Sequence, residues 1–185
     1  MTEQSHERPR GGGIAFWITL ACAAVVVVVD QLTKLWAASA LADGRTMDVI
    51  GSLIRFQLAF NSGAAFSSGT GFTWVFTIIS GIVSAAIIVF AWRVRSMPWA
   101  VGLGALFGGA ISHFGDRLLR GSSLGNGYVI DFIDYVGWFI GNVADIAIVL
   151  GVVYLGLLAV LKVPTGRTRP PSTTTPERAG TIEPV

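Results

Sequence analysis

Charged residues are scarce in this chain of 185 residues. Lys, Arg, Asp and Glu make up 13% of the sequence, whereas hydrophobic residues make up 52%. A water-soluble domain usually carries about 25% charged residues. The scarcity therefore excludes an ordinary soluble domain, and the formal net charge of only +2 gives no reason to expect a nucleic-acid partner. We expect a membrane protein.

Cysteine and histidine are almost absent. Cys22 is the single cysteine, so no internal disulfide can form. The two histidines are His6, in a polar tail, and His113, so no serine or cysteine has a plausible catalytic base beside it. A metal site built from His113, Asp116 and Asp145 would lack a fourth ligand. We therefore expect neither a metal nor another cofactor.

Four apolar stretches are each about the length that a helix needs to cross the hydrocarbon core of a bilayer. We expect membrane spans at about 14–36, 72–92, 97–115 and 138–161. They make residues 14–162 one membrane-embedded domain. The polar N-terminal segment 1–13 and the proline-rich C-terminal segment 163–185 cannot bury enough apolar surface to fold, so both are predicted to be disordered tails.

The segment 41–71, between the first two spans, contains a strand pattern. Ile54, Phe56, Leu58 and Phe60 alternate with less apolar residues, and this period of two is typical of a strand with one apolar face. Residues 128–134 form another possible strand. Because a strand cannot lie open in lipid, both should pair in a small sheet at the interface. The predicted fold is a membrane all-α bundle of four transmembrane helices with a small β element on the outer face.

Basic residues favour an orientation with both termini in the cytoplasm. Eight of the 13 Lys and Arg residues then lie on the inner side, at positions 8, 10, 93, 95, 162, 167, 169 and 178. All aspartates fall on the outer side, at positions 30, 43, 48, 116, 131, 134 and 145. The acidic chemistry is therefore expected near the outer surface of a plasma membrane.

Asp116 and Asp145 lie toward the outer ends of the third and fourth spans. Antiparallel neighbouring helices would bring the two carboxylates together, and two carboxylates in contact share one proton. Such a pair performs aspartic-protease chemistry: the ionised acid takes a proton from water while the protonated acid polarises the scissile carbonyl. Two alternatives stay open. Asp116 could pair with Arg117 as an interfacial anchor, or the carboxylates could serve a small proton-coupled transporter.

Five short motifs follow one another in a specific order. They are Asp30–Lys34, Phe60–Ser67, Gly108–Ala110 leading to Asp116-Arg117, Val129–Asp134 and Asn142–Asp145. In this order and spacing the chain resembles the lipoprotein signal peptidases (signal peptidase II), bacterial aspartic proteases that remove signal peptides from lipid-modified prolipoproteins. The resemblance covers about residues 26–161.

The resemblance implies Asp116 and Asp145 as the catalytic pair. Residues that it implies to bind substrate or support the site are Asn61, Gly63, Arg117, Asp131 and Asn142. Asp30 and Lys34, four residues apart at a helix end, are expected to form a structural pair. The implied substrate is a prolipoprotein whose cysteine carries a diacylglyceryl group, cut just before that cysteine. The protein is expected to act as a monomer, with membrane lipid as its other partner.

His113 is a departure from the family pattern. It stands where the family usually has an asparagine that contributes to the site. Imidazole can donate the same hydrogen bond, but unlike an amide it can also titrate near neutrality. We expect His113 to act as a neutral donor to the pocket. The alternative is a relative that has lost catalysis and binds lipidated peptides without cutting them.

Overall fold

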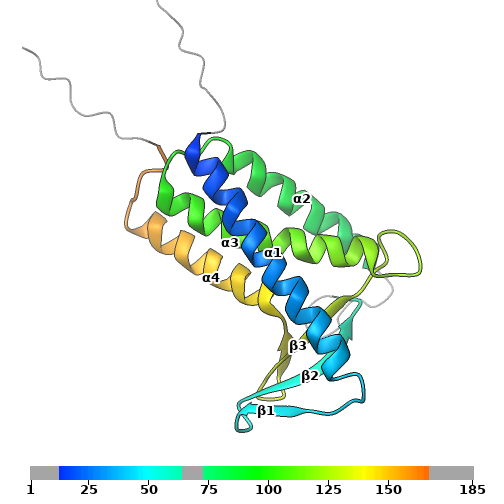
Figure 1. Cartoon of the computed structure of the whole chain (residues 1–185). Helices are drawn as coiled ribbons and strands as arrows, with labels where there is room; N and C mark the ends of the chain where they lie inside the picture. Colours follow the sequence, from blue (N-terminus) through cyan, green and yellow to red (C-terminus); the bar gives the residue numbers. More distant parts are fainter. Residues whose placement is uncertain (1–12, 64–72, 167–185) are drawn as a thin grey trace, which may run out of the picture.

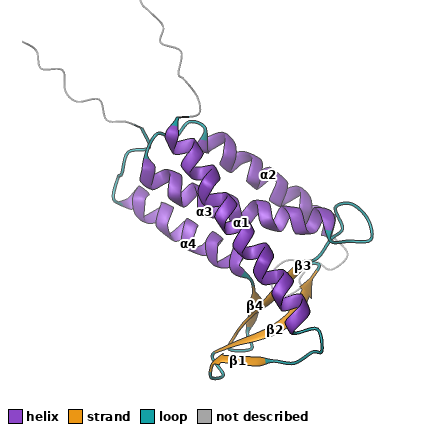
Figure 2. Ribbon diagram, in the orientation of Figure 1, coloured by secondary structure: helices purple, strands orange, loops and turns teal. Residues whose placement is uncertain are grey.

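The computed structural model describes residues 13–63 and 73–166. Both predicted tails, apart from residues 13 and 163–166, and the part of the predicted outer segment between residues 64 and 72 lie outside the described residues. Four helices run side by side, and a small sheet lies at one end of the bundle (Figures 1 and 2). The site described below lies where the helices meet this sheet.

The helices largely match the predicted spans. They are α1 (Ile14–Ala40), α2 (Thr73–Ala91), α3 (Met97–Leu119) and α4 (Val143–Val160). The largest difference is the start of the last helix, which was predicted at about residue 138. Residues 139–141 instead form a strand, and Asn142 caps the helix through its side chain. Asp145 consequently lies in the first turn of α4, whereas a helix that began at residue 138 would place it about two turns in.

Three of the described helices, α1, α2 and α4, are long and apolar enough to cross a membrane. The third predicted span, α3, is long enough, but glycines and polar side chains such as Ser112 and His113 dilute its apolar stretch. This composition suits a central position, because α3 packs against all three other helices and needs little lipid-facing surface. The expected bundle with a small β element is confirmed, whereas the crossing of a membrane by α3 stays a prediction.

Small residues let α3 approach its neighbours closely. A Cβ atom added to Gly108 would lie 2.7 Å from Cβ of Val26 on α1, and one added to Gly109 would lie 2.7 Å from the carbonyl oxygen of Ala144 on α4. Helices in lipid gain most of their association from such close packing. The two glycines therefore fix the separation of α3 from α1 on one side and from α4 on the other.

The sheet is antiparallel and has the order β1-β2-β3-β4. Its strands are β1 (Met47–Ile50), β2 (Ile54–Asn61), β3 (Val129–Tyr135) and β4 (Phe139–Gly141). Both predicted strands, β2 and β3, are confirmed, and they pair with each other from Ile54↔Tyr135 to Asn61↔Val129. This pairing places the loop after β2 next to the start of β3.

An apolar cluster attaches the sheet to the end of α1. Ala37 and Leu41 of this helix pack with Phe132 and Ile133 of β3, and all four side chains are buried. On its edge, Trp36 meets Phe56 in a T-shaped ring contact. These apolar contacts fix the position of β3, which carries Asp131, relative to the helices.

Gly108→Ala should destabilise the bundle, because the added methyl group has no room against α1. We expect a loss of about 1–3 kcal/mol, which thermal unfolding in detergent would measure. Gly115→Ala is the matched control, because nothing lies within 4 Å of a Cβ added there. Because alanine favours the helix more than glycine does, that variant should be at least as stable as the parent. Equal midpoints for the two variants would contradict the close packing of α1 and α3.

Candidate active site

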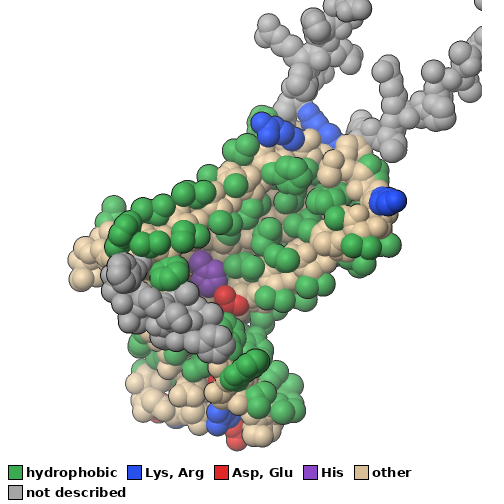
Figure 3. All heavy atoms as spheres, turned by 180° about the vertical axis from the view of Figure 1, so that it is seen from behind, with side chains coloured by type: hydrophobic (Ala, Val, Ile, Leu, Met, Phe, Trp, Pro, Cys, Tyr) green, Lys and Arg blue, Asp and Glu red, His purple; other side chains and the backbone are tan. Residues whose placement is uncertain are grey.

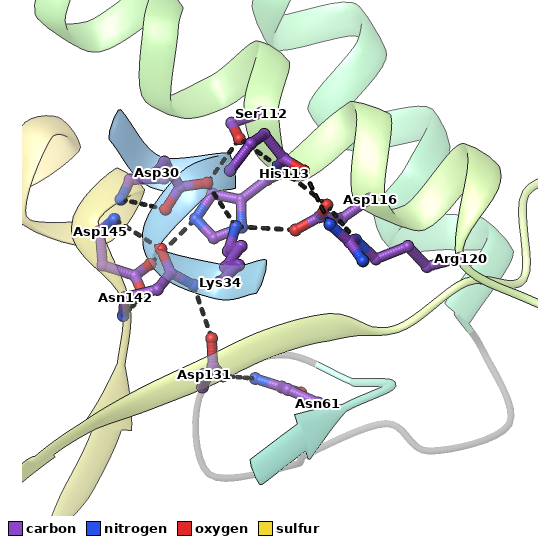
Figure 4. Close-up of polar contacts among 12 residues, drawn as sticks. Asp30, Lys34, Asn61, Ser112, His113, Asp116, Arg120, Asp131, Asn142 and Asp145 are labelled. Carbon is purple, nitrogen blue, oxygen red and sulfur yellow. Dashed lines mark hydrogen bonds and ion pairs between the residues drawn. The ribbon is translucent and has the colours of Figure 1, made fainter. Parts of the chain in front are cut away.

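Asp116 is held in a buried cluster of charges between α1 and α3 (Figure 4). Nζ of Lys34 lies 2.7 Å from Oδ2 of Asp116 and 2.5 Å from Oδ2 of Asp30. Nε of Arg120 and the side-chain amide of Gln31 donate to the other oxygen of Asp116, over 2.7 and 3.0 Å. The Asp116 side chain is only 2% exposed. Both of its oxygens are thus engaged with donors of this cluster.

The predicted contact between Asp116 and Asp145 is therefore wrong. Among the described residues, no hydrogen bond joins the two side chains, and they line different clefts. The helix ends are neighbours, as expected, but Asp116 turns toward Lys34 of α1. Because two cations already neutralise it, Asp116 is not placed to share a proton with a second carboxylate.

Asp131 and Asp145 are the two carboxylates that the fold brings together. The link is Asn142, which is completely buried. Its side-chain amide donates to Oδ1 of Asp131 over 2.6 Å, and its backbone N–H donates to Oδ2 of Asp145 over 2.9 Å. In return, the backbone N–H of Asp145 donates to the Asn142 side-chain oxygen over 3.1 Å. One reciprocal helix cap thus positions both acids.

Two further side chains complete the surroundings of the pair. The amide of Asn61, at the end of β2, donates to Oδ2 of Asp131 over 3.1 Å. The Asn61 side-chain oxygen accepts from the backbone N–H of Gly63 over 3.0 Å. Nε2 of His113 lies 3.0 Å from Oδ1 of Asp145. The predicted supporting residues therefore surround Asp131 and Asp145 and not Asp116. They are Asn61, Gly63, His113 and Asn142.

The two carboxylates line one cleft of about 290 Å³, here called the active-site cleft. Its wall includes His113, Arg117 and Asn61 on the polar side and apolar residues of α2 and α4 on the other. In Figure 3 a histidine and an acidic side chain lie together at the end of a hollow between apolar helices. A peptide bond that reached this cleft would meet both acids.

Asp131 is the acid of the pair that holds a proton at mildly acidic pH. Its burial, first, and the negative charge of Asp145, second, raise the pKa of Asp131 from 3.8 to about 6. Hydrogen bonds from Asn61 and Asn142 act in the opposite direction but do not cancel this rise. A protonated and an ionised carboxyl group can therefore coexist in the cleft.

Arg117 offers a free donor at the cleft. Its side chain is 7% exposed and lies over the Phe76 ring, 5.4 Å from the ring centroid. One terminal nitrogen donates to the carbonyl oxygen of Gly63. The other, Nη1, has no hydrogen-bond partner among the described residues. A buried, unpaired guanidinium N–H is costly, so this atom is suited to a polar group of a ligand.

Asp30 and Lys34 form the ion pair that their spacing predicts, and the structure gives it further contacts. Oδ1 of Asp30 accepts from the backbone N–H of Ala144 over 2.9 Å, next to Asp145. Its Oδ2 accepts from Ser112, next to His113, over 2.6 Å. The pair thus ties α1 to α3 and α4, two of the three helices that line the active-site cleft. We did not predict the roles of Ser112, Gln31 and Arg120, although Arg120 lies four residues after Asp116.

These features define a membrane-embedded enzyme with an acidic site at the junction of a helix bundle and a small sheet. Residues 22–161 match the family model described as signal peptidase (SPase) II. The chain is 42% identical to a lipoprotein signal peptidase of Bifidobacterium longum subsp. infantis, over 78% of this chain and 79% of the relative. The chain therefore belongs to the signal peptidase II family and is a bacterial membrane protease.

Other relatives agree with this assignment. A lipoprotein signal peptidase of Mycobacterium leprae is 39% identical over 77% of this chain and 71% of its own length. A solved structure of a bacterial membrane enzyme, 31% identical, superposes with a TM-score of 0.67 and covers 78% of this chain and 87% of the solved one. The fold is thus shared with a solved bacterial membrane enzyme.

Lys34→Met should unfold the protein readily, because it leaves the buried carboxylates of Asp30 and Asp116 without their shared cation. Removing one partner of a buried ion pair costs about 3–5 kcal/mol, which thermal unfolding would reveal. Arg45→Met is the control, since the Arg45–Asp43 pair is exposed and worth about 0–1 kcal/mol. A Lys34→Met protein as stable as Arg45→Met would contradict the structural role of the cluster.

The carboxyl group of Asp131 should titrate in an unusual range. Because its pKa is raised to about 6, we expect it to be about nine-tenths protonated at pH 5 and about one-tenth protonated at pH 7. Infrared difference spectroscopy would show a protonated-carboxyl band that disappears as the pH rises through this range. The band should be missing from Asp131→Asn and should survive in Asp116→Asn. A band that has already disappeared at pH 5, as the pH is raised, would show that burial does not raise the pKa of Asp131.

Proposed function

We propose that this protein cleaves the signal peptide from diacylglyceryl-modified prolipoproteins, just before the lipidated cysteine, with Asp131 and Asp145 as the catalytic dyad. The proposal replaces Asp116, which the sequence led us to expect, by Asp131. The single observation that carries it is the Asn142 cap, which joins the Asp131 and Asp145 side chains in one cleft. The names of the relatives support the choice of substrate.

The chemistry follows from the different protonation of the two acids. Ionised Asp145 takes a proton from a water molecule as the water oxygen attacks the scissile carbonyl carbon. Protonated Asp131 donates its proton to the carbonyl oxygen, so the tetrahedral intermediate is a neutral diol. Asp145 then gives its proton to the leaving amide nitrogen while a hydroxyl proton returns to Asp131. The peptide bond breaks, and the dyad again holds one proton.

The neighbouring residues orient the dyad and the peptide. Asn61 and Asn142 each donate to one oxygen of Asp131, which fixes the plane of its carboxyl group. Nη1 of Arg117, which has no partner among residues 13–63 and 73–166, is available for a carbonyl oxygen of the signal peptide. Gly63 connects both, because it contacts the Asn61 side chain and the Arg117 guanidinium. We propose that these residues bind the extended peptide on either side of the scissile bond.

His113 takes part by holding Asp145. A neutral imidazole that donates from Nε2 would stabilise ionised Asp145 and fix the orientation of its carboxylate. A charged imidazole would also favour ionisation of nearby Asp131 and so remove the shared proton. We therefore propose that neutral His113 replaces the family's asparagine without loss of catalysis.

We further propose that both termini face the cytoplasm, with the site near the outer face of the plasma membrane, and that α3 is a fourth membrane span. In Figure 1 the sheet lies at the bundle end opposite the first turn of α1. Arg95, whose backbone N–H donates to Thr165, lies with the C-terminal end of the described chain. The positive-inside tendency supports a cytoplasmic position for this end. We propose a monomer, since one chain supplies the complete site.

Cleavage of a diacylglyceryl-modified prolipoprotein by purified protein in detergent tests the dyad. We expect Asp131→Asn and Asp145→Asn to remain folded and to lose at least about a thousandfold in kcat/KM, because each removes one half of the acid–base pair. Asp116→Asn should lower the thermal midpoint but keep the activity of the folded protein within about tenfold. A folded, inactive Asp116→Asn beside an active Asp131→Asn would restore the pair that the sequence suggested. Binding without cleavage by the parent protein would identify a non-cleaving relative.

The pH dependence of His113→Asn tests the role of the imidazole. Acid pH should inhibit the parent enzyme more than the variant, because protonation of His113 disturbs the sharing of one proton by Asp131 and Asp145. The measurement is kcat/KM against pH for both proteins on the same substrate. His113→Gln is a second neutral variant that separates charge from side-chain shape. Superimposable profiles for parent and variants would refute a titrating His113.

A further inference from the structure

Among the described residues, three clefts meet at the carboxylate pair. The active-site cleft continues on one side into a cleft of about 510 Å³ over the sheet, here called the sheet cleft, which shares Asn61, Asp131 and Phe139 with it. On another side lies a cleft of about 330 Å³, here called the α4 cleft. It is lined by Tyr135, Phe139, Asp145, Ile146, Val149 and Leu150. Asp145 and Phe139 thus border both the active-site cleft and the α4 cleft.

The α4 cleft is an apolar track that starts at a catalytic carboxylate. Val149 and Leu150 follow Ile146 at spacings of three and four residues, so the three side chains form one stripe along the helix. Val149 and Leu150 are 59% and 62% exposed, which means that the track opens toward the lipid beside α4. Asp145 is the one charged residue in its lining. A purely apolar ligand therefore fits this track.

The other two clefts have different characters. Arg55, Gln57 and Asp134 make the sheet cleft polar, and the Arg55 guanidinium donates to Asp134 over 2.6 Å. The active-site cleft runs between α2, with Ile79 and Val83, and α4, with Ile148. Both of these helices pack on α3, which lies between them. The three directions out of the dyad are thus a polar face and two apolar passages of different shape.

The proposed substrate also has three arms that meet at one residue, and the inference rests on that proposed function. The signal peptide leaves the scissile bond on one side as an apolar helix, and the mature polypeptide leaves on the other. The third arm, the diacylglyceryl group, hangs from the cysteine side chain only a few bonds from the scissile nitrogen. Its acyl chains must therefore enter lipid through an opening directly at the dyad.

We propose that the α4 cleft binds the acyl chains of the substrate's diacylglyceryl group. The mature polypeptide suits the sheet cleft, whose side chains can satisfy peptide hydrogen bonds. A helical signal segment is about 10 Å wide and needs a passage flanked by two helices, which the active-site cleft provides. The α4 cleft, bordered by one helix and the end of the sheet, is left for narrower acyl chains. Asp145 then lies at the point where lipid and peptide separate.

Photo-crosslinking tests the placement of the arms. The full chain carrying Asp131→Asn would hold an intact prolipoprotein whose acyl chains bear a diazirine. We expect the label on Ile146, Val149 or Leu150, and we expect a photo-leucine in the signal segment to label Ile79 or Val83 of α2. Acyl labels on α2, with α4 residues 146–150 unlabelled, would overturn the proposal.

A kinetic test uses a groove-filling substitution. Val149→Trp should lower kcat/KM about tenfold for a substrate with long acyl chains and leave a substrate with short chains nearly unchanged. Val160→Trp places the same side chain at another exposed apolar position of α4, away from the cleft, and should change neither. An equal loss for long and short chains in Val149→Trp would show that the cleft does not bind acyl chains.

The two proposals fail in different ways. If Asp131→Asn still cleaves, the dyad assignment is wrong, but the acyl label on Val149 and its neighbours would still place the lipid. If the dyad variants are inactive and the acyl label lies on α2, the α4 cleft assignment alone is wrong. The crosslinking map and the cleavage assay thus separate where the lipid lies from which acids cut.

Discussion

The ammonium group of Lys34, buried between the carboxylates of Asp30 and Asp116, is the interaction on which the rest of the site depends. It joins α1 to α3. Asp30 extends the connection to α4 through the backbone N–H of Ala144. Buried charges are tolerated only when they are paired and hydrogen-bonded, and here each partner of Lys34 has further donors. Three helices are thereby fixed relative to one another at the level of the proposed dyad.

The charge cluster around Lys34 also distinguishes a structural carboxylate from the acid pair, a distinction that the sequence does not reveal. Asp116 is committed to structure by its cations, whereas Asp131 and Asp145 lie on the other side and receive mostly amide and imidazole donors. Arg117 faces this second pair with one nitrogen unpaired among the described residues. The site therefore combines a rigid, neutralised support with an acid pair that can still hold one proton. The α4 cleft, which we propose for the acyl chains, begins at Asp145 of this pair.

The amino-acid pattern predicted most of the fold. Uncharged stretches located all four helices to within a few residues except at the start of α4, and alternation located β2 and β3. The start of α4 was missed because Trp138–Gly141 is as apolar as a helix, and hydropathy does not distinguish a short buried strand from a helical turn. The Asn142–Asp145 spacing, typical of a helix cap, was a signal for the true start.

The sequence predicted which residues gather at the site, but not which two aspartates lie together. Asn61, Gly63, His113, Asn142 and Asp145 gather as expected. The exchange of Asp116 for Asp131 could not be predicted, because it depends on which way the Asp116 side chain turns from α3 and on how far β3 reaches under the bundle. Both depend on tertiary packing between segments distant in sequence. Lys34, four residues from Asp30, indicated one ion pair and gave no sign of the second one with Asp116.

The most direct measurement is an experimental structure with a peptide inhibitor whose scissile bond is replaced by a tetrahedral hydroxyl-bearing carbon, which imitates the intermediate. The account predicts that this hydroxyl lies within hydrogen-bond distance of both Asp131 and Asp145, with Asp116 still paired to Lys34. A hydroxyl bound by Asp116 and Asp145, with Lys34 displaced, would contradict it.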